Sequence, residues 1–185
     1  MKPSLTSQHN QSRLVIVDIQ QRLAEAMPVE TMQNVSKYCG ILLQAASLLE
    51  IPVLYTEQYP KGLGHTLPEL MPLLTTASRI EKTAFSCPAE PTFRQQLSSD
   101  RPQIILAGME AHICILQTAL DLHASGYQVF IAEDVVLSRS AANKANALER
   151  LRQAGIIVSN TESIAFEWLG KGEGEAFKQI SRLIR

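Results

Sequence analysis

The stretch "PQIILAGMEAHICILQTALDLHASGYQVFIAED", residues 102–134, contains a strand, a helix and a second strand in succession. "PQIILAGM" and "YQVFIAED" are apolar runs of strand length, and the second one ends in acids. Between them, "ICILQTALDLHASG" has helical spacing of apolar residues, and Gly126 ends it as a typical C-terminal glycine. A helix that joins two buried strands predicts a parallel sheet.

The same alternation runs through the rest of the chain. We expect further strands at residues 13–19, 51–56, 78–86 and 156–160, and further helices at 29–50, 91–99, 139–155, 161–170 and 175–185. Residues 57–72 are rich in Gly and Pro and predict a loop. The pattern predicts an α/β fold with helices on both faces of the sheet. We expect residues 1–185 to form one domain, in which 1–12 are a polar N-terminal extension.

Composition narrows the class of protein. The 185 residues carry 17 basic and 18 acidic side chains, a net charge of −1, which gives no reason to expect nucleic acid or acidic membranes as partners. The apolar runs are shorter than the roughly 18 residues of a membrane span, and the N-terminus lacks the apolar core of a signal peptide. We therefore expect a soluble, cytoplasmic protein. Its three cysteines contain no C-x-x-C pair.

Three polar residues fall where a parallel sheet places its functional sites. Such sites lie beyond the carboxyl ends of the strands. Asp18 ends the first strand, Lys82 follows a short one, and Cys114 begins the helix after the strand at 102–109. A cysteine hydrolase needs a nucleophilic sulfur, a base and donors for the oxyanion. Asp18 can be the base, Lys82 its electrostatic partner and Cys114 the nucleophile.

Each of these residues also has a structural interpretation. Cys114 could be an apolar filler of the core, Asp18 a cap, and Lys82 a solvated surface charge. The chain could accordingly be a non-enzymatic binding or scaffold protein. A nucleotide-binding protein is the third class, but neither G-x-G-x-x-G nor a P-loop follows the first strand.

The motifs resemble those of a known family. "VIVDIQ" (15–20), "IEKTAFS" (80–86) and "GMEAHICILQTALDLHASGYQVFIAEDVVLSRS" (108–140) resemble the isochorismatase-like cysteine hydrolases over about residues 14–163. "YTEQYPKGLG" (55–64) is similar to the branch of isochorismatase-domain-containing proteins. The resemblance implies a three-layer α/β/α sandwich, Rossmann-like, around a six-stranded parallel sheet. It also implies that Asp18, Lys82 and Cys114 form the catalytic triad.

The resemblance implies further details of the chemistry. A cis peptide bond is implied between Met109 and Glu110, with the backbone N–H groups of Glu110 and Cys114 as the oxyanion hole. Isochorismatases that cleave a vinyl ether lack the cysteine, so Cys114 indicates hydrolysis of an amide or related C–N bond. Nicotinamidases of the family bind metal through an Asp-x-His motif. This chain has Glu57 and His65 there instead, so we expect neither metal nor cofactor.

The remaining expectations concern the pocket, the thiol and assembly. A helix N-terminus and a lysine predict a lowered pKa for Cys114. We expect the apolar stripe of the last helix to lack a partner within the chain, which predicts a homo-oligomer with residues 164–184 in the contact; the alternative is that this helix packs back on its own sheet. We expect a small amide as substrate, in a pocket lined by Gln20, Tyr55, Glu57, Tyr59, Phe85 and His112. The stripe consists of Phe177, Ile180, Leu183 and Ile184, next to Ala165, Phe166, Trp168 and Leu169.

Overall fold

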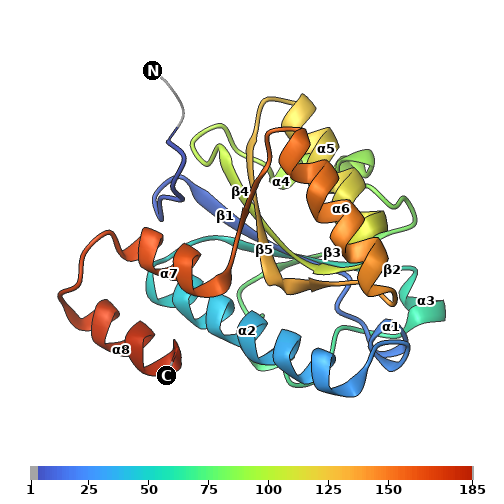
Figure 1. The fold of residues 1–185 in the computed structure, drawn as a ribbon, viewed down its shortest axis with the longest axis horizontal. Helices are drawn as coiled ribbons and strands as arrows, with labels where there is room; N and C mark the ends of the chain where they lie inside the picture. Colours follow the sequence, from blue (N-terminus) through green and yellow to red (C-terminus); the bar gives the residue numbers. More distant parts are fainter. Residues whose placement is uncertain (1–3, 185) are drawn as a thin grey trace.

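A parallel sheet forms the middle layer of the molecule (Figure 1). The computed structural model describes residues 4–184. Its strands run in the order β3-β2-β1-β4-β5-β6, and every neighbouring pair is parallel. The strands are β1 (Ser12–Val17), β2 (Val53–Gln58), β3 (Ser78–Lys82), β4 (Gln103–Met109), β5 (Gln128–Leu137) and β6 (Ile157–Ser159).

Helices cover both faces of this sheet, which confirms the predicted three-layer α/β fold. In Figure 1, α2, α7 and α8 lie on one side and α4, α5 and α6 on the other. The helices are α1 (Gln21–Glu25), α2 (Val29–Leu48), α3 (Pro60–Leu63), α4 (Pro91–Gln96), α5 (Leu116–Ala124), α6 (Ala141–Gln153), α7 (Thr161–Leu169) and α8 (Glu175–Ile184). Within residues 4–184, no helix combines the length and the apolar character that a membrane span requires.

The sheet separates two apolar cores because successive side chains of a strand point to opposite faces. In β1, Leu14 and Ile16 belong to the core beneath α2, α7 and α8. Val15 and Val17 belong to the core beneath α4, α5 and α6. Alternate residues of a strand therefore face opposite layers of helices.

Several predicted boundaries differ in the structure; β3, for example, ends at Lys82 and not at residue 86. The helix expected from residue 113 begins with a π-helical turn, η3 (Ala111–Ile115), before α5. β5 runs on to Leu137, and its register against β4 shifts between the pairs Leu106–Ile131 and Gly108–Val136. The loop predicted at 57–72 contains α3 and a single 3-10 turn, η1 (Met71–Leu73). No feature of the apolar pattern marks these irregular turns.

The polar segment before β1 packs onto the body of the protein. Ser12, the last residue of the expected extension, is the first residue of β1. Ser7 is buried, and its N–H and Oγ both donate to Glu167 Oε2, at 2.7 and 2.8 Å. Residues 1–3 of the expected extension lie outside the described residues. The rest is therefore anchored to α7.

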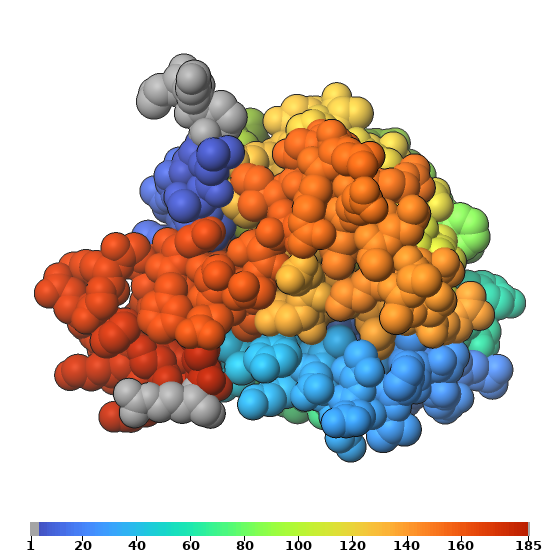
Figure 2. Space-filling model, viewed as in Figure 1, coloured from blue at the N-terminus to red at the C-terminus, as the bar shows by residue number. Residues whose placement is uncertain are grey.

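The C-terminal helices find partners within the chain. Ile180 of α8 and Ile164 and Trp168 of α7 are buried in the core that contains α2. Figure 2 shows the red C-terminal segment against the cyan surface of α2. The expectation that the apolar stripe has no partner within the chain is therefore wrong. Phe166 is the large apolar side chain of this region that stays exposed, at 38%.

Candidate active site

The carboxyl ends of β1, β3 and β4 bring three predicted residues together. Asp18 follows β1 with a left-handed backbone at φ 52°, Lys82 is the last residue of β3, and Cys114 lies in η3 after β4. All three are buried, and Cys114 keeps 6% of its surface exposed. A sulfur, a carboxylate and an ammonium thus share one small space at the edge where parallel sheets place their sites.

Asp18 and Lys82 form a buried ion pair. Lys82 Nζ lies 2.7 Å from Asp18 Oδ2, and neither side chain is exposed. The other oxygen, Oδ1, accepts a hydrogen bond from Thr56 Oγ1 at 2.6 Å. Among the described residues, no donor directs a well-aligned hydrogen bond at Oδ2. Oδ2 therefore has lone-pair capacity left for a proton.

Lys82 is surrounded by further acceptors. Four acceptors besides Asp18 lie within hydrogen-bond distance of its three N–H donors: Gln58 Oε1 at 2.6 Å, the carbonyls of Ala84 and Phe85 at 3.2 and 3.3 Å, and Cys114 Sγ at 3.6 Å. Burial by itself lowers the pKa of Lys82, but attraction to Asp18 and to the neighbouring thiols outweighs it, so the pKa lies above its ordinary value. The ammonium therefore stays charged.

The environment of Cys114 favours the neutral thiol. Burial, followed by the charge of Asp18, raises the pKa of Cys114 to about 12, although Lys82 acts in the opposite direction. The predicted lowering of this pKa is therefore wrong for the resting site. The helix terminus and one lysine do not compensate for desolvation beside a carboxylate.

Glu110 connects the turn of η3 to the loop after β5. The Met109–Glu110 peptide bond is cis, as the family resemblance implies. The Glu110 carbonyl accepts from the N–H groups of Ile113 and Ile115, at 3.0 and 3.3 Å. Its buried carboxylate accepts from the Arg139 N–H at 2.9 Å and from Arg139 Nε at 3.1 Å. Both ends of this residue are therefore fixed.

Two of the predicted pocket residues lie on the wrong face of the sheet. Tyr55 belongs to the core beneath α2, whereas Cys114 belongs to the opposite core. Glu57 shares the face of Tyr55 because it lies two residues further along β2. The positions between and after them, Thr56 and Gln58, are the ones that contact Asp18 and Lys82. Sequence reasoning missed these two residues, although the alternation of a strand could have identified them.

Of the other four predicted pocket residues, two have side chains bonded within the protein and two have exposed side chains. Gln20 is fully buried, and its amide bonds to the backbone of Gln58 and to the Gly64 carbonyl. Tyr59 and Phe85 are more than half exposed, and their neighbours in the chain contact Lys82. His112 is half-buried and its Nδ1 lies 2.9 Å from Ser138 Oγ. Tyr59 and Phe85 are thus available to a ligand, whereas the Gln20 amide is already bonded.

The oxygens of Glu57 are occupied by protein donors. Oε1 accepts from the N–H and Oγ1 of Thr66, at 2.7 and 2.9 Å, and Oε2 lies 3.0 Å from Arg79 Nε and 3.2 Å from His65 Nδ1. No group of three His, Cys, Asp or Glu side chains gathers at metal-binding distances in residues 4–184. Glu57 therefore acts as an anchor for the segment after α3.

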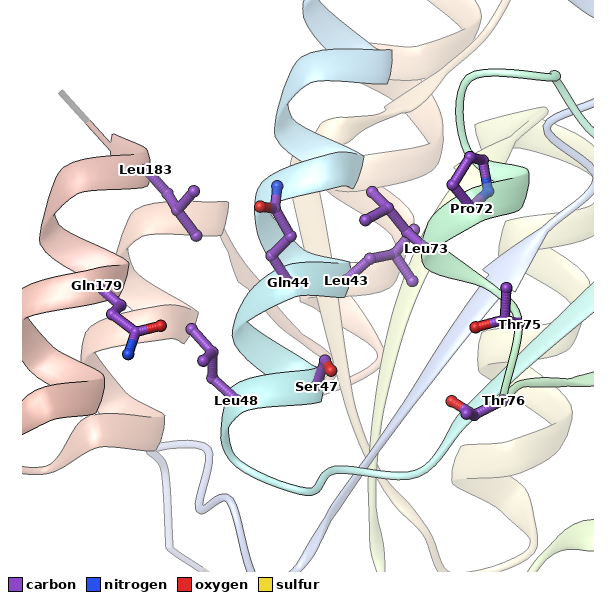
Figure 3. A pocket seen from close by; sticks show the side chains of 10 residues that line it. All are labelled: Leu43, Gln44, Ser47, Leu48, Pro72, Leu73, Thr75, Thr76, Gln179 and Leu183. Atoms are coloured by element: carbon purple, nitrogen blue, oxygen red, sulfur yellow. The ribbon is translucent and has the colours of Figure 1, made fainter.

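The pocket in Figure 3 lies away from this cluster. It has a volume of about 330 Å³ between α2, the segment after η1 and α8, and its lining includes Leu48 and Leu183. None of Asp18, Lys82 and Cys114 takes part in it. This pocket is therefore separate from the buried charged cluster.

Comparison with known proteins identifies the class to which this fold and cluster belong. The isochorismatase domain family model matches residues 12–163, so the chain belongs to the isochorismatase-domain family. Isochorismatase domain-containing protein 2 of Bos taurus is 37% identical over 177 residues, which cover 94% of this chain and 83% of that protein.

Two solved structures have the same fold as this chain. The MAR1 ribonuclease of Caenorhabditis elegans is 34% identical, with a TM-score of 0.88, and the match covers 97% of this chain and 92% of that one. The YcaC protein of Escherichia coli, an octameric hydrolase of unknown specificity, has a TM-score of 0.88 at 20% identity and covers 99% and 92% of the two chains. Both structures share the fold of this chain, and the family match indicates a hydrolase.

Proposed function

We propose that the chain is a cysteine hydrolase that cleaves a small amide or a related C–N bond through a thioester on Cys114. The observation that carries this proposal is the buried cluster, in which Lys82 Nζ lies 2.7 Å from Asp18 Oδ2 and 3.6 Å from Cys114 Sγ. A carboxylate, an ammonium and a thiol are the parts that such a reaction requires. A core with only a structural role gains nothing from burying two charges.

The first half of the reaction forms the thioester. Asp18 takes the thiol proton as Cys114 Sγ attacks the carbonyl carbon, and the carbonyl electron pair moves onto oxygen. The backbone N–H groups of Glu110 and Cys114 stabilise that oxyanion. When the intermediate collapses, the C–N bond breaks, and Asp18 returns its proton to the leaving nitrogen.

The second half releases the acid. Asp18 removes a proton from water, whose oxygen attacks the thioester carbon, and the C–S bond then breaks. The sulfur leaves as a thiolate and regains the proton from Asp18. Lys82 remains protonated throughout, because its raised pKa keeps the ammonium charged, and it stabilises both the carboxylate and the transient thiolate.

The neutral resting thiol is compatible with this scheme. With a pKa of about 12, Cys114 is almost fully protonated at neutral pH, so attack requires a base at the moment of reaction. The open lone pair of Asp18 Oδ2 supports that role. Tyr59, Phe85 and His112 are the pocket residues that we assign to binding the rest of the substrate.

Ammonia release tests the proposal on a panel of amides, carbamoyl compounds and ureido acids. We expect at least one to be hydrolysed by the wild type and none by Cys114→Ala. Mass spectrometry after a rapid acid quench should find the acyl group on the peptide that contains Cys114. If Cys114→Ala keeps its activity on a hydrolysed substrate, the mechanism is wrong. If no member of the panel reacts or acylates Cys114, the non-enzymatic binding protein becomes the better explanation.

The name of the Caenorhabditis elegans relative makes RNA a second substrate class. RNA binding depends mainly on cationic side chains that neutralise phosphates. This chain has 17 basic against 18 acidic residues, which favours the small amide. Cleavage of single-stranded RNA by the wild type but not by Cys114→Ala would support the RNA alternative.

A further inference from the structure

The amide of Gln58 occupies a decisive place beside Lys82. Of the neutral acceptors around Lys82 Nζ, Gln58 Oε1 is the nearest at 2.6 Å, whereas the carbonyls of Ala84 and Phe85 lie at 3.2 and 3.3 Å. An ammonium has three N–H donors. In a buried site, a donor that lacks a close acceptor destabilises the charged form. Gln58 therefore makes the shortest neutral contact of the ammonium.

The orientation of this amide is fixed by its other end. Gln58 Nε2 donates to the Thr83 carbonyl at 2.7 Å, while Oε1 faces the Lys82 ammonium. A reversed amide would place two donors together at Lys82 and two acceptors together at Thr83, so only one orientation satisfies both neighbours. The amide thus connects the end of β2 to Lys82 and to the residue after it.

The backbone of Gln58 is held as firmly as its side chain. Its N–H donates to Gln20 Oε1 at 2.6 Å, and its carbonyl accepts from Gln20 Nε2 at 3.0 Å. Gln58 also lies directly opposite Lys82 in the pairing of β2 with β3. The buried Gln20 therefore fixes the backbone of Gln58, and the Gln58 side chain in turn holds the Lys82 ammonium.

We infer that Gln58 is a positioning residue that holds the Lys82 ammonium between Asp18 and Cys114. This inference rests on the proposed function for its catalytic consequence. The side chain touches neither Asp18 nor Cys114 by a hydrogen bond, so it acts on them through Lys82. If the amide is removed, the carbonyls of Ala84 and Phe85 are the neutral oxygen acceptors that remain near Nζ, and they are more distant. The Lys82 ammonium then stabilises the Cys114 thiolate less well.

The test is a double-mutant cycle on the reactivity of Cys114. Gln58→Met keeps the length of the side chain and removes its acceptor. At each pH between 7 and 10, we expect iodoacetamide to alkylate Cys114 about tenfold more slowly in Gln58→Met than in the wild type. The apparent pKa of the thiol should rise to match. In the Lys82→Met background, Gln58→Met should have no further effect. Equal losses in both backgrounds would overturn the inference.

Gln103→Met is the matched control. Like Gln58, Gln103 bonds through both ends of its amide, to the Gln8 N–H at 2.7 Å and the Thr6 carbonyl at 3.1 Å, but it is buried at the opposite end of the sheet. Its replacement should lower stability and leave the alkylation profile of Cys114 unchanged. An equal change in the profile would mean that the loss of any doubly bonded amide, and not its place beside Lys82, is responsible.

A second measurement separates this inference from the proposed function. Nitrogen-15 NMR detects a buried lysine ammonium whose protons exchange slowly, and no turnover is needed. We expect the Lys82 signal in the wild type and in Gln103→Met, and its loss or broadening in Gln58→Met. That result without any thioester on Cys114 would contradict the function alone. An unchanged Lys82 signal in Gln58→Met would contradict the positioning role alone.

Discussion

At the scale of single residues, the two carboxylate oxygens of Asp18 have different neighbours. Oδ1 of Asp18 accepts from Thr56, and Oδ2 faces Lys82 and has no aligned donor among the described residues. Thr56 thereby fixes the orientation of the carboxylate and, in the mechanism that we propose, leaves the other oxygen for the proton of Cys114.

Asp18→Asn should move the reactivity of Cys114 and its catalysis in opposite directions. The charge of Asp18 raises the pKa of Cys114, so its removal should lower that pKa and speed alkylation at neutral pH. Turnover should fall by roughly 10²–10⁴-fold because the general base is lost. Alkylation rates and ammonia release measure the two effects. A variant that keeps near-full turnover would show that Asp18 is not the base.

Thr56→Val should lower turnover about tenfold and cost about 1–3 kcal/mol of stability, because a buried carboxylate oxygen loses its donor. Thr161→Val is the matched control. Thr161 is also buried, and its Oγ1 donates to Asp134 Oδ1 at 3.0 Å, away from Cys114. It should lose comparable stability and keep its turnover. Denaturant unfolding and steady-state kinetics distinguish the two variants, and equal kinetics in both would contradict the role of Thr56.

At the scale of elements, the strand ends bring the site together. The succession of strands and helices was enough to predict the sheet and to place Asp18, Lys82 and Cys114 at one edge. The face of each β2 residue follows from strict alternation, and neglect of that rule led to Tyr55 and Glu57 instead of Thr56 and Gln58. The turn of η3 could not be predicted, because it depends on two N–H groups that bond to one carbonyl, that of Glu110.

Gly108 of β4 lies close against Val17 of β1, next to the site. It has φ 127°, and a Cβ there would collide with the carbonyl of Val17. Gly108→Ala should therefore cost more than about 3 kcal/mol, since a backbone clash adds to the strain of positive φ. Gly126→Ala is the control, because its φ is 90° but a Cβ there meets nothing within 4 Å.

Thermal or denaturant unfolding should accordingly show a large loss of stability for Gly108→Ala and a loss of about 1–2 kcal/mol for Gly126→Ala. Gly108→Ala should also lower the alkylation rate of Cys114 or abolish turnover, because Met109 and Glu110 follow directly. Equal and small losses in both variants would mean that β4 can move away from β1 at no cost.

At the scale of the whole molecule, the buried thiols link stability to alkaline pH. Burial raises the pKa of Cys39 to about 12 and that of Cys87 to about 11, and Cys114 also reaches about 12, from an ordinary value of 9.0. The folded state therefore binds these protons more tightly than the unfolded state does. Their contribution is complete below pH 9 and is lost progressively as the pH rises towards 12.

Thermal melting between pH 7 and 11 should thus show stability that declines above pH 9. Cys39→Ala should start from a lower stability, because it leaves a small cavity, but should decline less steeply with pH. Cys39 is the suitable position because it lies on the buried face of α2, in the core on the other side of the sheet from Cys114. Parallel pH profiles for the wild type and Cys39→Ala would contradict the linkage.

Assembly is the remaining property at this scale, and we expect a homo-oligomer. Most of the stripe that suggested a contact at residues 164–184 is used within the chain, since Ile164, Trp168 and Ile180 are buried. What remains for a second copy is Phe166, 38% exposed, with the ring of Phe177 at 6.3 Å from its own.

Phe166→Glu should therefore shift the protein towards smaller species in light scattering and leave its fold intact, because the side chain projects from α7 into solvent. Val29→Glu is the matched control, since Val29 is also exposed, at 74%, but lies at the start of α2. Ile180→Glu is unsuitable, because it would bury a charge in the core. A monomeric wild type would contradict the oligomer. An oligomer that survives Phe166→Glu and dissociates in Val29→Glu would instead place the contact at the start of α2.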